Sequence, residues 1–300
     1  MELEEFSLRN PRDLRGFTEM KHCLTFKVWK PVEWKPVARS LLLSMLSSVL
    51  VLVLSGSWAG VAWAGALSDR LAQYPNWQNK PPLQAAQNNL VYPDWFAGEW
   101  LATTTLTDLV APLAPDVVTP GFEGNRDYLN QPVAFQVRFV PLQDGETGNP
   151  AIADHPTQWV SDRAFNGLNL ARAYLDSPER KSPVLAVKVD PTNPNRQITV
   201  LRGDRQLVST VTARATETPS PNQFLTSELF QQEFRGSAQL YFNQVETTTA
   251  YTLSTNTDTT NPEILADQIT AIYLSPQDPD YFKAPEQPVA LYRYHMTLSR

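Results

Sequence analysis

The sequence predicts an all-β protein, an antiparallel barrel of about eight to ten strands with one or two short helices, preceded by a hydrophobic N-terminal segment. Three observations predict this. Short runs rich in threonine, valine, tyrosine and phenylalanine recur over residues 91–300. Proline, glycine and Asx turn formers separate these runs. A long uncharged stretch precedes all of them.

The uncharged stretch covers residues 41–64. A basic region, an apolar centre and small residues in an A-x-A arrangement, here at 62–64 or 64–66, are typical of a secretory signal peptide. The 24 residues would also span roughly 30 Å of hydrocarbon, so membrane association through an uncleaved anchor stays open. Apolar density peaks at 41–54 and then falls, which favours cleavage. In both cases the remainder is expected to be exported. The preceding basic residues are Lys30, Lys35 and Arg39.

The chain therefore divides into four parts. Residues 1–40 form an extension on the inner side of the membrane, and either Met1 or Met20 is the true start. Residues 41–66 form the signal peptide or anchor, residues 67–90 a polar, proline-containing linker, and residues 91–300 one β domain. About 210 residues suffice to bury a sizeable core.

Composition excludes some classes of function. The single cysteine, Cys23, precedes the uncharged stretch, so the exported part has no disulfide and no thiolate. From Gly65 onward, 17 basic residues face 25 acidic ones, a net charge of 17 − 25 = −8. Because no basic stripe interrupts this acidic surface, nucleic acid is not expected as a partner.

The strands are expected where the runs show β-type composition and alternation. Alternation is clearest at 133–140, where Phe135, Val137 and Phe139 point one way and Gln136 and Arg138 the other. The predicted strands are 100–106, 133–140, 184–189, 197–201, 206–213, 240–242, 245–253, 268–274 and 289–298.

Two segments show helical periodicity. Residues 162–175 place an apolar face behind Asp162 as an N-cap, although the Asn166-Gly167 pair is a turn signal. Residues 226–234, with Leu229, Phe230 and Phe234 as a stripe, are the better candidate.

The stretch "FAGEW" at 96–100 forms an F-x-G-x-W pattern. It resembles the first strand of lipocalins and related calycin barrels. Gly98 permits a tight turn, and the resemblance implies that Trp100 covers one end of the barrel. It also implies that an arginine of the last strand packs over this indole and closes the barrel, a place for which Arg293 is available. The alternative is that Trp100 belongs to an ordinary aromatic core cluster.

A second resemblance covers residues 90–298. The stretches "YPDWFAGEW", "DRAFNGLNLARAYL", "YLSPQDPDYFKAP" and "PVALYRYHM" are similar to a family of uncharacterised exported proteins from cyanobacteria and chloroplasts. This resemblance implies a periplasmic or thylakoid-lumen location and no particular activity.

Histidines and carboxylates offer little chemistry. His155, beside Asp154, has no partner suited to catalysis or metal binding. His295 shares the face of Arg293 in the last run, so it is expected to point inward with it. The ends of the chain loosely resemble nitrobindins, whose barrels hold haem, and haem at His295 is therefore an alternative. A hydrogen-bonded core histidine is favoured. The motifs for calcium are missing, and Asp278 and Asp280 are expected to cap turns.

Arginines supply the candidate ligand pocket. Arg163, Arg172 and Arg214 lie in apolar surroundings, where arginines usually extend to solvent or pair with a carboxylate. As pocket residues they would suit an acidic head group. Three glutamates, Glu228, Glu233 and Glu246, are candidates for an interior acid–base site, but nothing in the sequence ties them to one cleft.

These observations favour a non-enzymatic barrel that binds an apolar or amphipathic small molecule, such as a lipid, an isoprenoid or a pigment. Assistance in the assembly of a photosynthetic membrane complex is a further form of this hypothesis, with that complex as partner. The alternatives are an enzyme with an acid–base site inside the barrel, a haem-binding barrel, and an interaction module that docks loops of membrane proteins. No cofactor and no metal are expected.

Overall fold

The computed structural model describes residues 65–142, 156–177, 179–236, 241–254 and 262–300. The helices are α2 (Ala66–Ala72) and α3 (Arg163–Leu175), with short 3-10 helices η1 (Asp94–Phe96), η2 (Glu123–Tyr128) and η4 (Tyr281–Lys283). The strands are β1 (Gln84–Ala85), β2 (Val91–Tyr92), β3 (Gly98–Val110), β4 (Pro132–Pro141), β5 (Trp159–Ser161), β6 (Val184–Asp190), β7 (Asn193–Leu201), β8 (Gln206–Ser220), β9 (Gln223–Arg235), β10 (Tyr241–Leu253), β11 (Glu263–Leu274) and β12 (Pro288–Ser299).

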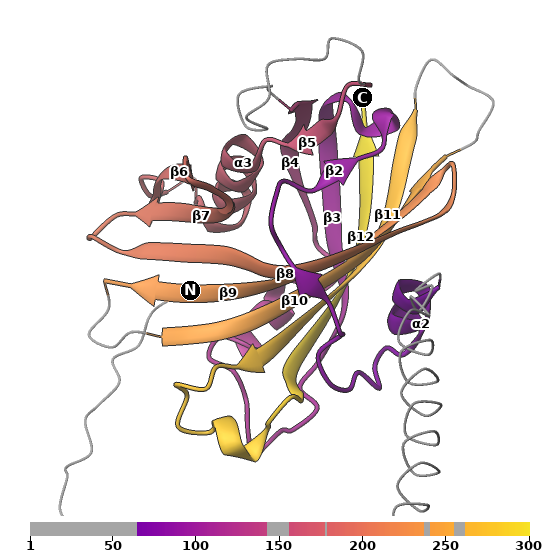
Figure 1. Cartoon of the computed structure of the whole chain (residues 1–300). Coiled ribbons are helices and arrows are strands. Elements are labelled where there is room, and N and C mark those ends of the chain that lie inside the picture. Colours follow the sequence, from indigo (N-terminus) through magenta and orange to yellow (C-terminus); the bar gives the residue numbers. More distant parts are fainter. Residues whose placement is uncertain (1–64, 143–155, 178, 237–240, 255–261) are drawn as a thin grey trace, which may run out of the picture. The chain divides into compact units, whose positions relative to one another are not determined.

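Twelve strands form one sheet (Figure 1). Its order is β2-β5-β4-β3-β12-β11-β10-β9-β8-β7-β6, and β1 pairs with β8 beside this path. Every pairing between these strands is antiparallel. The predicted, predominantly antiparallel β fold with few helices is therefore confirmed.

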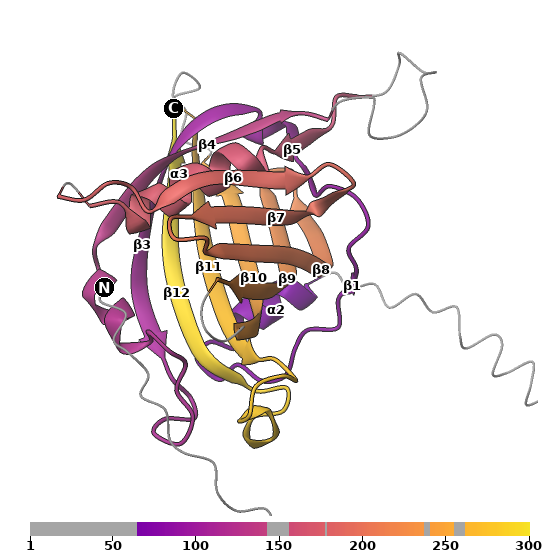
Figure 2. The ribbon, with the colours of Figure 1, turned by 90° about the vertical axis from the view of Figure 1, so that its left-hand side faces the viewer.

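The sheet is curled, and its two ends do not pair with each other in the described residues. Figure 2 shows β3 and β12 upright while β6 and β7 run across the view. Irregular pairings in β3, β8 and β12 contribute to this curl, because a bulge bends its strand. Helix α3 packs against both β4 and β6. A helix thus stands where the prediction of a closed barrel requires strand pairing.

Helix α3 confirms one of the two helical predictions. Asp162 is its N-cap, and the carboxylate of Asp162 accepts a hydrogen bond from the backbone N–H of Phe165 at 3.0 Å. The other prediction, a helix over 226–234, is wrong because these residues belong to β9. Exposure does not alternate along this strand, because residues 224–227 are buried and residues 228–235 are partly buried apart from the exposed Gln231. A strand buried on both faces has neighbouring apolar residues that imitate a helical stripe.

The two faces of the curled sheet carry different side chains and are covered by different segments. The inner face carries Ala102, Thr104 and Met296, and α3 lies against it. The outer face carries Ile269 and Tyr273, which pack with Trp77.

Residues 65–90 are named here the leader segment. The segment packs on the outer face through Trp77, pairs with β8 through β1, and ends at Leu90 in the cluster of Trp100. This segment covers the predicted linker, yet Leu67, Arg70, Trp77 and Leu90 are buried. Arg70 donates hydrogen bonds to the fully buried carboxylate of Glu246 at 3.0 and 2.8 Å. The leader segment is thus bound to the domain by an internal ion pair rather than running free in solvent.

Trp100 lies in the largest aromatic cluster of the core and is 2 % exposed. Its indole N–H donates to the backbone oxygen of Phe96 at 2.7 Å. Gly98, between these residues, has a φ of 92°, a conformation that other residues rarely adopt. The predicted tight turn before the first long strand is therefore present.

An arginine does cover Trp100, but it is Arg300 and not Arg293. The guanidinium carbon of Arg300 lies 4.5 Å from the centre of the Trp100 ring, and Arg300 also donates to the backbone oxygen of Ala97. The β3–β12 register pairs Leu298 with Ala102, which brings the C-terminal residue beside Trp100. The prediction that Arg293 fills this place is wrong.

None of the helices in the described ranges is of a length and apolarity that would let it cross a bilayer. The predicted extension 1–40, and residues 41–64 of the predicted signal peptide or anchor, lie outside the described residues.

Candidate functional site

A cavity of about 480 Å³ lies against the inner face of the sheet, and we name it the main cavity. Strands β3, β4, β11 and β12 supply most of its wall, and α3, η2, β2, β5 and β10 supply the rest. Alternation explains the wall, because every second residue of each strand faces inward. Along β12 these inward residues are Tyr294, Met296 and Leu298. The space is therefore lined mainly by apolar and aromatic side chains.

Helix α3 is held at the edge of the main cavity by Asn166. The Asn166 side chain accepts a hydrogen bond from the backbone N–H of Arg138 at 2.7 Å and donates to the backbone oxygen of the same residue at 3.0 Å. It thereby pairs with the exposed edge of β4 as a neighbouring strand would. Asn166, Leu170 and Tyr174 recur every fourth residue, and all three line the main cavity.

The polar groups of the main cavity are neutral hydroxyls and amides. Burial raises the pKa of Tyr174 and of Tyr294 above the ordinary value of a phenol. Gln268 donates to the Thr270 hydroxyl at 3.4 Å. Among the described residues that line the main cavity there is neither a carboxylate nor a histidine. The wall can therefore hydrogen-bond a ligand through neutral groups.

These phenols predict a fall in stability at high pH. Burial raises the pKa of Tyr251, which lines the main cavity, from 10.0 to about 12. In the unfolded chain this phenol releases its proton from about pH 10. The stabilisation is therefore complete below pH 10 and is lost as pH rises towards 12. Urea unfolding across this range should show the decline, and Tyr251→Phe should make it shallower. An unchanged slope in the variant would contradict the assignment to this phenol.

A smaller pocket of about 220 Å³, named here the mouth pocket, adjoins the main cavity. Tyr92, Phe135, Ser161, Asn166 and Leu170 line both spaces, so the two lie side by side.

Arg163, Gln197 and Glu228 line the mouth pocket but not the main cavity. Gly167 of α3 makes room here, because a Cβ at this position would lie 2.7 Å from the side-chain nitrogen of Gln197. The mouth pocket is thus more polar than the main cavity that it adjoins.

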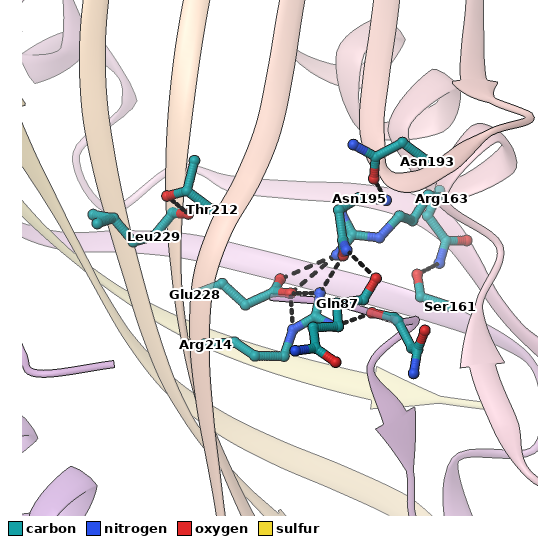
Figure 3. Close-up of polar contacts among 11 residues, drawn as sticks. Gln87, Ser161, Arg163, Asn193, Asn195, Thr212, Arg214, Glu228 and Leu229 are labelled. Carbon is teal, nitrogen blue, oxygen red and sulfur yellow. Dashed lines mark hydrogen bonds and ion pairs between the residues drawn. The ribbon is translucent and has the colours of Figure 1, made fainter. Parts of the chain in front are cut away.

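Two arginines meet one glutamate at the mouth pocket, and we name Arg163, Arg214 and Glu228 the mouth cluster (Figure 3). Arg163 donates to Glu228 at 3.0 Å, and Arg214 donates to it from two nitrogens at 3.1 and 2.7 Å. Arg214 also donates to Asn195 at 2.7 Å and to the backbone oxygen of Asn88 in the leader segment. The three charged side chains are only 13 to 15 % exposed.

The structure brings together two of the three predicted pocket arginines. Arg163 and Arg214 share Glu228, whereas Arg172 is exposed on α3 and lines neither the main cavity nor the mouth pocket. Sequence reasoning did not single out Glu228 as their partner. The β8–β9 register, which places Arg214 opposite Glu228, is the signal that identifies it.

The last strand turns Arg293 and His295 away from the main cavity, so the expectation that His295 points inward is wrong. The His295 side chain is 60 % exposed and lies 3.5 Å from Asp267. Arg293 pairs with the same carboxylate at 2.8 Å and lies over the Tyr74 ring. The haem alternative required an inward His295. His155 lies outside the described residues.

The candidate carboxylates do not converge. Glu228 belongs to the mouth cluster, Glu246 to the outer face with Arg70, and Glu233 pairs with Arg235 at 2.7 Å.

The two aspartates of the 275–287 loop have local partners. Asp278 accepts a hydrogen bond from the backbone N–H of Asp280, as a turn-capping residue does, and Asp280 pairs with Lys283. In the part of the chain that the structure describes, no group of three or more histidine, cysteine, aspartate or glutamate residues is arranged to hold a metal ion.

Comparison with known proteins identifies a family. Neither curated proteins nor solved structures give a match. Residues 84–300 match the family described as "Domain of unknown function (DUF6816)". This range begins at β1 and includes the main cavity, the mouth cluster and the Trp100–Arg300 contact. Because the match covers well over half of the chain, the protein belongs to the DUF6816 family.

Proposed function

We propose that the domain binds one apolar or amphipathic small molecule, such as a lipid, an isoprenoid or a pigment, in the main cavity. The observation that carries this proposal is the cavity itself. Its volume of about 480 Å³ falls in the range of roughly 300–1,000 Å³ that is usual for sites of small ligands. Its wall combines a large apolar area with a few neutral hydrogen-bonding groups, which is the composition of a binding site.

We also propose that the domain has a calycin-like fold. The indole of Trp100 under the guanidinium of Arg300 supports it, because the first long strand and the end of the chain meet there. The open strand order, with α3 between β4 and β6, separates this domain from a continuous cylinder.

The proposed location is the exported side of a membrane, in the periplasm or the thylakoid lumen. The uncharged residues 41–64, which follow a basic region, support this location. A membrane on this side would supply apolar molecules to the main cavity.

Filling the main cavity should abolish binding. Thr104 is buried and points into the cavity, whereas its neighbour Thr103 belongs to the opposite face of β3. Thr104→Trp should therefore weaken binding of a fluorescent long-chain lipid by at least about tenfold, because the indole occupies the ligand's space. Fluorescence titration of the purified protein measures this effect.

Thr103→Trp is the matched control, and it should bind the lipid as the wild type does. Organic extraction of wild-type protein purified from cells, followed by mass spectrometry, should also yield an apolar molecule that the Thr104→Trp protein lacks. Equal lipid binding by both tryptophan variants would remove the main cavity as the site.

A further inference from the structure

We infer that the bound molecule carries an anionic end group, and that this group binds Arg163 at the mouth pocket. This inference rests on the proposed function and adds the chemical class of the ligand, an amphiphile with a carboxylate-like head.

The mouth cluster has an excess of positive charge. Its two guanidinium groups carry two positive charges and Glu228 carries one negative charge, so one positive charge is uncompensated within the cluster. The domain around it is acidic, with 17 basic and 25 acidic residues from Gly65 onward. Because the cluster is largely shielded from water, this charge acts on a nearby anion with little screening by salt.

The two arginines have different roles. Arg214 uses its nitrogens on Glu228, Asn195 and the backbone oxygen of Asn88, and it does not line the mouth pocket. It holds Glu228 in position. Arg163, in contrast, lines the mouth pocket, and one of its guanidinium nitrogens donates to Glu228 at 3.0 and 3.3 Å. Arg163 is therefore the cation that an incoming anion reaches.

Polar neighbours complete the site. The Gln197 amide and the Ser161 hydroxyl line the same pocket. Gly167 lets Gln197 approach α3, although glycine inside a helix is less favourable than alanine. The mouth pocket adjoins the main cavity and shares five lining residues with it. In the proposed complex one molecule places its apolar chain in the cavity and its head at Arg163. Charge-assisted hydrogen bonds to a guanidinium are stronger than neutral ones, so an anionic head is preferred to a hydroxyl.

The test compares a medium-chain fatty acid with the alcohol of the same chain length, by calorimetric titration at neutral pH. The wild-type protein should bind the acid about tenfold more tightly than the alcohol. Arg163→Gln should remove this preference, because it weakens binding of the acid far more than binding of the alcohol. Arg172→Gln, on the same helix but outside both spaces, is the matched control and should keep the preference. Glu228 stays paired with Arg214 in the Arg163 variant, so the fold should persist, as thermal unfolding would verify.

Each outcome has a distinct meaning. Equal affinities for acid and alcohol in the wild type would overturn the anionic head and leave the proposed function standing. A preference that survives Arg163→Gln would overturn the role of Arg163. Binding of neither compound would refute the inference and the proposed function together.

Discussion

Replacing Glu246 by alanine should lower the free energy of unfolding by about 3–5 kcal/mol, the usual cost of removing one partner from a buried ion pair. The Glu246 carboxylate is fully buried, and it accepts hydrogen bonds from Arg70, Trp77 and Tyr273. In the alanine variant, Arg70 either stays buried between the leader segment and the sheet without its counter-charge, or the leader segment detaches and exposes Trp77. Both results cost stability, and equilibrium unfolding in urea measures their size.

The control for this prediction is a second glutamate of the sheet. Glu233 on β9 pairs with the more exposed Arg235, and loss of this pair should change stability by only about 0–1 kcal/mol. Combining Glu246→Ala with Arg70→Met should cost less than the sum of the single changes, because the double variant has no unpaired buried charge. Additive losses would show that the two side chains are energetically independent.

Trp100→Ala should destabilise the domain by about 3–5 kcal/mol, as expected for deletion of a buried aromatic side chain. The indole is 2 % exposed, packs with Phe96 and Phe139, and satisfies its N–H within the core. The surrounding rings are in edge and tilted contacts and fill the resulting space only in part. Thermal and urea unfolding both report the loss.

A double-mutant cycle tests which arginine contacts Trp100. Arg300→Ala should couple to Trp100→Ala by roughly 0.5–1 kcal/mol, the value of an exposed cation–π contact. Arg293→Ala serves as the control, because Arg293 pairs with Asp267 on the outer face and should combine additively with Trp100→Ala. Coupling to Arg293 and not to Arg300 would contradict the observed packing of Arg300 over the Trp100 ring.

Local patterns predicted much of the secondary structure. The alternation at 133–140 corresponds to β4, and the cap and periodicity at 162–175 correspond to α3. Both signals depend on neighbouring residues alone. Residues 226–234 misled the same reasoning because burial on both faces of β9 removes the alternation that marks a strand.

The candidate site depends on register, which local patterns do not contain. Arg214 meets Glu228 because β8 and β9 pair in one alignment, and a shift by one residue would turn the two side chains to opposite faces. Arg300 rather than Arg293 covers Trp100 for the same reason, since the β3–β12 register pairs Ser299 with Leu101 and Arg293 with the distant Asp108. The positive charges could be identified beforehand, but their partners could not.

The leader segment has a consequence for the order in which the domain matures. Arg70 and Glu246 are separated by 176 positions along the chain. Closing so long a loop carries a high entropic cost, which only an already assembled sheet can offset. During synthesis, residues 65–80 therefore emerge before β10 and β11 and have no binding surface until these strands arrive. We expect residues 65–80 to be among the last of the domain to acquire protection from hydrogen exchange.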